Sequence, residues 1–382
     1  MRKFLQQVLC SRRSVAFIFT TALCLAILAG APSSAFAKAN RNAYVTSNIN
    51  GTVEVIDPKT DTVTTTISGF THPFCLTVSP DGKLLYVCNT NNTISVVDTE
   101  TNSISATISV AGVGFIGQEG AGPNVAFSPN GERAYVVTSG GGVNSELITI
   151  NTESNTVVSR TSFGSTFLLA VAVAPDKDNV YLGTSAGIMV VDADGDAVTT
   201  TIAAGHDITD LVLSRDGDRL YGSDNSGFTG GTSGVLVVNT DKNTVEATVP
   251  LPFGPSLITG LTLTPDGRHL YAADFLFRAG NSTVTVIDTR DNSIDTTITA
   301  NGLSLTSLAV TTNGKKVLAT NAILSTTVHS TVAVIDTRDN TIADSIPAGL
   351  FSAVVATQTG GSHRGDGDDH GDADDHDRDN DH

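Results

Sequence analysis

The stretch from Ser79 to Asn89, "SPDGKLLYVCN", reads as a tight turn followed by a short strand. Pro, Asp and Gly in succession favour a turn, and the alternation of Leu, Tyr and Val that follows favours a strand. Nearly the same phrase returns as "SPNGERAYVVT", "SRDGDRLYGSD" and "TPDGRHLYAAD". A phrase that recurs along a chain predicts a repeat architecture.

A second phrase follows each copy of the first. It is an alternating apolar strand that closes on Asp or Asn, then a turn and a Thr-rich strand, as in "TISVVDTETNSISATI". Seven copies are present, and their closing residues are 41 to 53 residues apart: Asp57, Asp98, Asn151, Asp192, Asn239, Asp288 and Asp336. Each unit therefore holds four short strands, which we call A to D.

Four short strands in each period of this length are typical of propeller blades. The first unit lacks its A strand, because "AYVTSN" (residues 43–48) reads as a B strand. The segment "FSAVVATQT" (residues 351–359) supplies the missing strand at the other end of the chain. We therefore predict an all-β, seven-bladed β-propeller of four-stranded antiparallel blades. Its ring is closed by the C-terminal A strand joining the N-terminal B, C and D strands, which leaves no open end.

The repeated phrases carry a resemblance to a known family. "YVTSN" and "SPDGKLLYVCNTNNTISVVDTETNSISATI" resemble the YVTN-type seven-bladed β-propeller repeat of bacterial and archaeal exported and surface-layer-like proteins, over residues 41–360. The resemblance implies a propeller with a binding or scaffold role and no shared catalytic residues. Lactonases of the phosphogluconolactonase type have similar hairpins and are the nearest enzymatic alternative. The absence of Trp argues against WD-repeat, kelch and quinoprotein propellers.

The N-terminal 37 residues have the pattern of a cleavable signal peptide. A start containing four cations precedes an apolar run, residues 15–30, and then Ala35-Phe36-Ala37. This order predicts cleavage after Ala37 and a periplasmic or secreted protein. "SRRSVAF" partly matches the twin-arginine pattern, but we prefer the general secretory route. The apolar run is too short for a stable membrane span.

Charge excludes some partners. The formal net charge of −17 becomes −21 when the four cations of the signal peptide are removed. Residues 361–382 hold nine Asp and two Arg, a charge of −7, so the body from 38 to 360 keeps −14. Such a body has no basic stripe for phosphates, which argues against nucleic acid as a partner. We expect a monomer.

Two cysteines are left after cleavage, Cys75 and Cys88. If residues 80–83 form a hairpin loop, counting outward from it places Cys75 opposite Cys88. Cross-strand neighbours are close enough for a disulfide, and an oxidising compartment favours the bond. We predict this disulfide.

Function is expected where the repeats differ. The A–B and C–D turns are short and uniform, whereas the long connections are D–A or B–C and share one face of the ring around the channel mouth. One interpretation is a catalytic or metal cluster at this mouth, formed by His72, His206, Asp207 and Glu119. We prefer a face that contacts a protein, glycan or small ligand, with these candidates: Phe70, Phe253, Asp274, Phe275, Phe277, Arg278 and His329.

The Asp-rich and His-rich segment 361–382 is predicted to be a disordered acidic tail. Its four histidines, His363, His370, His376 and His382, are candidate ligands for a divalent metal such as zinc, nickel or copper.

The sequence thus favours an exported binding or scaffold module whose elaborated loop face meets a protein or envelope ligand, with no required cofactor. The first alternative is a lactonase-like hydrolase with a site at the channel mouth. The second is a periplasmic metal-handling protein that works through its tail. The sequence favours a binding function over an enzymatic one.

Overall fold

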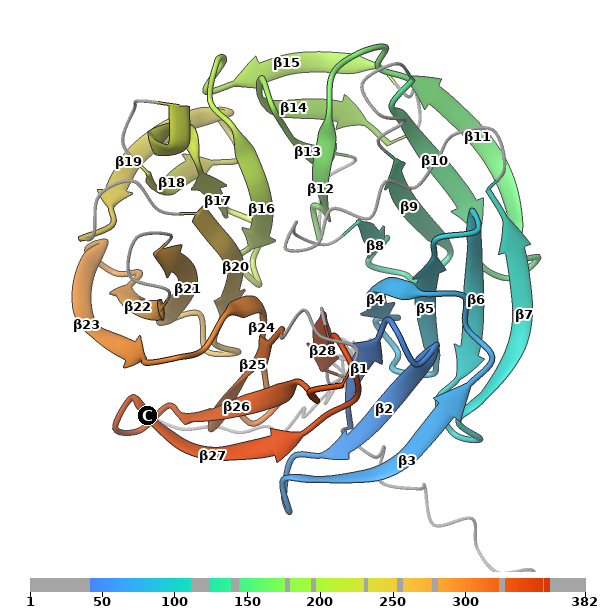
Figure 1. Ribbon diagram of the computed structural model, residues 1–382. Helices are drawn as coiled ribbons and strands as arrows, with labels where there is room; N and C mark the ends of the chain where they lie inside the picture. Colours follow the sequence, from blue (N-terminus) through green and yellow to red (C-terminus); the bar gives the residue numbers. More distant parts are fainter. Residues whose placement is uncertain are drawn as a thin grey trace, which may run out of the picture. The chain divides into compact units, whose positions relative to one another are not determined.

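The four-strand unit expected from the repeated phrases occurs seven times around a ring in the computed structural model (Figure 1). The structure describes residues 42–110, 124–138, 144–175, 179–193, 197–229, 233–252, 257–276, 281–322, 327–352 and 354–357. All of them belong to the second of two units into which the chain divides, Met1–Ala39 and Asn40–His382. The predicted signal peptide and acidic tail lie outside the described residues.

Three complete blades come first. Blade 1 contains β4 (Pro73–Val78), β5 (Leu84–Asn89), β6 (Thr93–Asp98) and β7 (Ser103–Ser109). Blade 2 contains β8 (Val125–Phe127), β9 (Arg133–Thr138), β10 (Glu146–Asn151) and β11 (Thr156–Ser162). Blade 3 contains β12 (Leu168–Val173), β13 (Asn179–Thr184), β14 (Gly187–Asp192) and β15 (Val198–Ile202).

Three further blades follow in chain order. Blade 4 contains β16 (Ile208–Leu213), β17 (Arg219–Asp224), the 3₁₀ turn η1 (Ser226–Thr229), β18 (Gly234–Asn239) and β19 (Thr244–Pro250). Blade 5 contains β20 (Leu257–Leu263), β21 (His269–Leu276), β22 (Asn281–Asp288) and β23 (Ser293–Ala300). Blade 6 contains β24 (Leu305–Val310), β25 (Lys316–Asn321), β26 (Thr331–Asp336) and β27 (Thr341–Pro347).

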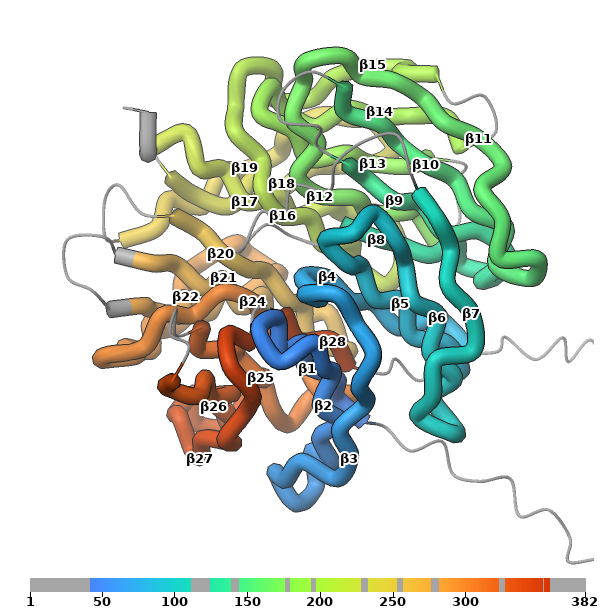
Figure 2. The backbone as a smooth tube through the Cα atoms, turned by 45° about the vertical axis from the view of Figure 1, so that its right-hand side comes forward, coloured from blue at the N-terminus to red at the C-terminus, as the bar shows by residue number. Residues whose placement is uncertain are grey.

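Blade 7 is built from both ends of the chain. It contains β1 (Ala43–Ser47), β2 (Thr52–Asp57), β3 (Thr62–Ser68) and, as its innermost strand, β28 (Val355–Thr357). Strand β28 pairs antiparallel with β1, with Ala43 opposite Thr357 and Val45 opposite Val355. Figure 2 shows the blue first strand beside the red last strand at this point of the ring. The predicted fold and its closure are confirmed.

The antiparallel order gives the ring two unlike ends. We call the end with the A–B and C–D turns the turn face, and the end with the D–A and B–C connections the loop face. The A–B turns are short, as between β4 and β5. The long connections are at the loop face, for example residues 110–124 between β7 and β8 and residues 225–233 between β17 and β18, although other connections there are as short as residues 185–186 between β13 and β14.

The hydrophobic core is divided among the blade interfaces. Seven clusters of buried side chains are present in the described part, and each draws from two neighbouring blades. One of them joins Tyr86 and Val96 of blade 1 to Val136 and Ile148 of blade 2. Alternation along each strand sends side chains to both faces of a sheet, so every blade contributes to two clusters. No blade can bury its apolar surface alone.

A tyrosine near the start of the second strand locks three blades to their successors. The hydroxyl groups of Tyr86, Tyr181 and Tyr271 donate to the side-chain oxygens of Asn155, Asn243 and Asn340 at 3.2, 3.3 and 2.7 Å. Each acceptor belongs to the C–D turn of the next blade and has a positive φ, a conformation that Asn tolerates better than most residues. In blade 6, Leu318 takes the place of the tyrosine, and Lys316 reaches Asp61 of blade 7 at 2.6 Å instead.

Every outer strand carries an irregularity. The pairing of the third strand with the outer strand shifts register once in each of the seven sheets, in blade 7 between Val55 and Ile56. Such bulges twist an exposed strand edge and discourage it from pairing with another chain.

Closure by β28 leads to a test by truncation. A chain ending at Leu350 lacks β28 and exposes the edge of β1, so we expect it to lose its cooperative thermal transition. A chain ending at Gly360 keeps β28, and its melting temperature should stay within a few degrees of that of the full chain. Circular dichroism melts measure both, and a cooperative native-like melt of the shorter chain would contradict the role of β28.

Candidate functional site

A buried polar residue lies at the loop-face end of the second strand of every blade; it is the last residue of that strand in six blades and lies two residues before the end in blade 5. These residues are Ser47, Asn89, Thr138, Thr184, Asp224, Asp274 and Asn321, and none is more than 4% exposed. Some of them hydrogen-bond to the backbone of the connections at the loop face. Asn89 accepts the backbone N–H of Thr71 at 3.0 Å, and Asn321 accepts that of Ser304 at 2.7 Å. These buried hydrogen bonds fix the connections to the ends of the second strands.

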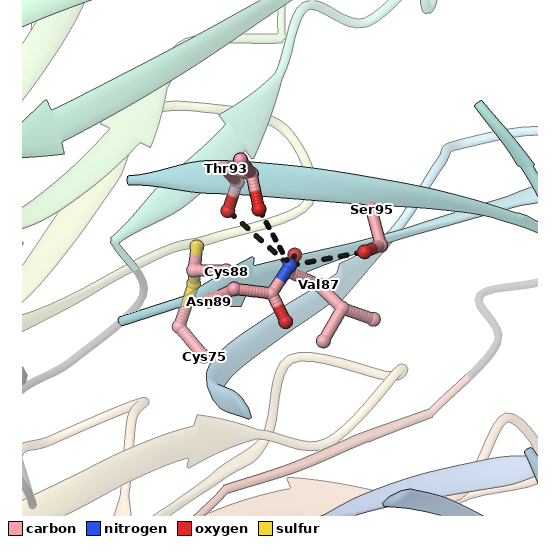
Figure 3. The surroundings of a disulfide bond; sticks show 6 residues. All are labelled: Cys75, Val87, Cys88, Asn89, Thr93 and Ser95. Atoms are coloured by element: carbon pink, nitrogen blue, oxygen red, sulfur yellow. Dashed lines mark hydrogen bonds between the residues drawn. A yellow bond between two sulfur atoms is a disulfide. The ribbon is translucent and has the colours of Figure 1, made fainter. Parts of the chain in front are cut away.

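Blade 1 strengthens this region with a disulfide (Figure 3). Cys75 lies directly opposite Cys88, as the hairpin count predicts, and the two form a disulfide with a Cα–Cα distance of 5.0 Å. Beside it, the Asn89 amide donates to the hydroxyls of Thr93 and Ser95 at 3.2 and 3.0 Å (Figure 3). The bond thus ties β4 to β5 at the level of the buried polar residues.

Blade 4 places a histidine against one of these residues. His206, in the connection before β16, meets Asp224 at the end of β17, with 2.7 Å between Nδ1 and Oδ2. Asp224 is 2% exposed, whereas the His206 side chain is 43% exposed. Burial and the neighbouring charge of Asp224 raise the pKa of Asp207. Asp207 is the carboxylate next to His206 among the candidates predicted from the sequence, but the hydrogen-bonded partner of His206 is Asp224.

This pair has the geometry of a base and its orienting group. A carboxylate that accepts from Nδ1 fixes the imidazole and leaves the other ring nitrogen to act as a base. The Ser226 hydroxyl beside this pair donates to Asp224. The arrangement is suited to activating a water molecule.

The other two loop-face histidines contact backbone carbonyls. His72 Nδ1 lies 3.2 Å from the oxygen of Asn48, and His329 Nδ1 lies 3.2 Å from that of Ala348. Both residues are exposed. His72 precedes β4 and His206 precedes β16, on different sides of the channel (Figure 1), and no described contact joins them. The expected grouping of His72 with His206 does not form in the described part of the chain.

Two of the expected ligand-face residues are buried. Phe70 is 8% exposed and packs with Tyr44 and Leu76 between blades 7 and 1. Asp274 is fully buried and accepts the Thr283 hydroxyl. These two residues support the loop face and do not form its surface. Phe275 is half-buried in β21.

The remaining sequence candidates lie outside the described residues. They are Glu119, Phe253, Phe277 and Arg278, together with the tail residues His363, His370, His376 and His382. Within the described ranges, no three His, Cys, Asp or Glu side chains gather in a group that could hold a metal. No helix in those ranges combines the length and apolar character needed to cross a membrane.

The central channel contains a cavity of about 1630 Å³. Its walls are the inner strands β4, β16, β20, β24 and β28, and its described lining extends to the A–B turns at Pro80, Pro129 and Pro265. The sequence predicts a site at the channel mouth on the loop face. The cavity instead reaches the turn face, because the inner strands run from the loop face towards their A–B turns.

Asp210 is a buried carboxylate in the wall of this cavity. It is 5% exposed and accepts the N–H of Leu211 at 2.7 Å and that of Leu261, in the neighbouring blade, at 2.6 Å. Burial raises the pKa of Asp210 to about 7, although the two N–H donors act in the opposite direction. Asp210 is not among the site residues predicted from the sequence. Its signal is a charge inside an inner strand, "TDLVLS", where the equivalent position in blade 1 is Cys75.

Asp210 makes stability depend on pH in a defined direction. A carboxyl group with a pKa raised on folding stabilises the fold in acid, and this stability is lost as the pH rises through about 7. Between pH 5 and pH 7 the loss is about 2–3 kcal/mol, since one pH unit corresponds to about 1.4 kcal/mol. The substitution Asp210→Asn should remove this slope from the free energy of unfolding.

Urea denaturation at several pH values between 5 and 8.5 measures this effect as the difference between the original chain and the variant. Asp216→Asn, in the turn after β16, is the matched control, because the Ser214 hydroxyl holds the pKa of Asp216 below its usual value. A difference that does not change with pH would show that Asp210 does not titrate in this range.

Comparison with protein families matches residues 62–98 to the WD domain, G-beta repeat family. The matched segment contains four strands, from β3 of blade 7 to β6 of blade 1. The absence of Trp argues against a WD-type repeat, but the match shows that a four-strand segment without Trp still fits that pattern. No curated protein matches the chain.

Solved structures with the same fold share little sequence with the chain. Hydrazine synthase of Kuenenia stuttgartiensis matches with a TM-score of 0.64 and 16% identity, over 77% of this chain and 92% of that one. Dihydro-heme d1 dehydrogenase NirN, in complex with DHE, matches with a TM-score of 0.58 and 14% identity, over 85% of this chain and 76% of that one. A functionally unknown protein from Desulfotomaculum acetoxidans DSM 771 matches with a TM-score of 0.65 and 13% identity, over 84% of this chain and 99% of that one. Identities this low establish the propeller fold alone.

Proposed function

We propose that this protein is an exported binding module that presents its loop face to a protein or a component of the cell envelope. A propeller is a general scaffold for binding, and the finer assignment rests on one observation. The long connections emerge at one end of the ring, where buried polar residues at or near the ends of the second strands hydrogen-bond to the backbone of the connections, as Asp224 does to Ser226 and Asn89 to Thr71. Variable loops on a rigid base are the usual construction of a recognition surface.

Export is part of the same proposal. The signal-like N-terminal segment supports it, and so does the disulfide, because such bonds persist in oxidising compartments. The acidic body, with its charge of −14, is compatible with a soluble protein in the periplasm or outside the cell.

Site-specific photo-crosslinking in the producing cells tests the loop face. Val328 on the loop face is 51% exposed, and the Arg338 side chain on the turn face of the same blade is 83% exposed. A photoreactive amino acid at position 328 should give a discrete crosslinked product of higher mass, whereas the same probe at 338 should not. Adducts at position 338 alone, or at neither position, would contradict the proposal.

A second candidate is a hydrolase that acts on a lactone, and the His206–Asp224 pair is the observation that favours it. If it holds, His206→Asn should lower the rate of lactone hydrolysis by at least about a hundredfold, as expected for loss of a general base. His72→Asn is the matched control and should leave the rate unchanged. A pH-stat assay with a simple aliphatic lactone measures both. A purified protein that does not hydrolyse the lactone, or a fully active His206→Asn variant, would eliminate this candidate.

A further inference from the structure

The channel cavity opens on the turn face, opposite the loops that carry the proposed function, and it has the features of a separate binding site. Its inner part is lined by one aliphatic side chain from each of five inner strands, at the same place in the repeat: Leu76, Leu211, Leu261, Leu308 and Val355. Its volume of about 1630 Å³ exceeds that of most small-molecule pockets, which range from about 300 to 1,000 Å³. The cavity is thus large enough for an extended segment of a polymer.

The walls of the cavity offer backbone as well as side chains. Each inner strand is the last strand of its sheet, so its channel-facing edge is not paired with another strand. Within the described residues, side chains of the neighbouring inner strands occupy part of this edge, as when Thr262 accepts the N–H of Val310 at 3.2 Å and Asp210 accepts that of Leu261 at 2.6 Å. Unpaired strand edges are the surfaces on which proteins hydrogen-bond to extended peptides.

The mouth of the cavity is charged, with opposite signs on two walls. Glu132 and Glu153 lie in the two turns of blade 2, where the N–H of Thr152 donates to the backbone oxygen of Glu132 at 3.0 Å. Arg215 lies in the A–B turn of blade 4, at the position that holds Pro in four of the other turns. All three side chains belong to exposed residues, and none of them forms an ion pair with another described residue.

These features define the chemistry of an occupant. Two carboxylates attract a cationic group to blade 2, and Arg215 suits a carboxylate at blade 4. The charge of −14 on the body favours the approach of a basic ligand over that of an acidic one. A small anion would meet three acidic residues at the mouth, Asp81, Glu132 and Glu153, and one cation.

We propose that the channel cavity binds an extended peptide segment of a partner protein through a lysine or arginine at Glu132 and Glu153 and a carboxylate at Arg215. The aliphatic ring accommodates an apolar side chain between these two charges. This site is independent of the loop face, so either one can fail without the other.

The probe for this site is a phage-displayed library of random dodecapeptides, panned against the full chain. Enriched peptides are then synthesised with a fluorescent label, and their affinities are measured by anisotropy. We expect enrichment of peptides that contain Lys or Arg. The variant E132K/E153K should weaken their binding by about tenfold or more, which corresponds to about 1.4 kcal/mol, and R215E should weaken binding of those that also carry a carboxylate.

The matched control is Glu100→Lys. Glu100 is exposed in the C–D turn of blade 1, at the position equivalent to Glu153, but does not line the cavity. This substitution should leave the affinity for the enriched peptides within about twofold of that of the original chain. Thermal melts should show that all the variants are folded. The proposal is overturned if no peptide is enriched, if the enriched peptides are acidic, or if they bind E132K/E153K as tightly as the original chain.

Discussion

The pairing of β28 with β1 is the constraint on which the rest of the structure depends. Every core cluster of the described residues lies between two blades, so each blade needs both of its neighbours to bury its apolar side chains. Without β28, blade 7 would lack its inner strand, and the interfaces on both of its sides would be incomplete. The three residues of β28 therefore contribute more to the stability of the ring than the length of the strand suggests. The Lys316–Asp61 contact strengthens the same junction where the tyrosine lock is missing.

The fold could be predicted from sequence because its signals are local and repeated seven times. Turn residues, period-two alternation and the Asp or Asn that closes each third strand identify strands directly, and the missing strand in the first unit identifies the closure. The disulfide register followed from counting residues along one hairpin. These features all depend on neighbours that are close in the chain.

The site was less accessible to sequence because it depends on contacts between distant segments. His206 is adjacent in sequence to Asp207, yet its imidazole meets Asp224, which the fold brings to it from β17. Phe70 has the sequence context of a loop, and only the packing of blades 7 and 1 shows that it is buried. Asp210 and Arg215 carry a signal that is visible in hindsight, a charge at a position where other copies of the repeat are uncharged. The same comparison between copies applies to any repeat protein.

The two ends of the propeller leave it at the same place. Ala43 is opposite Thr357, and both residues lie where β1 and β28 meet the turn face. Any attachment through either end, whether to a surface, a polymer or another domain, would therefore pull on this face. The loop face lies at the opposite end of the ring from both of these residues. The strand that closes the ring therefore also fixes the end of the propeller at which the chain enters and leaves it.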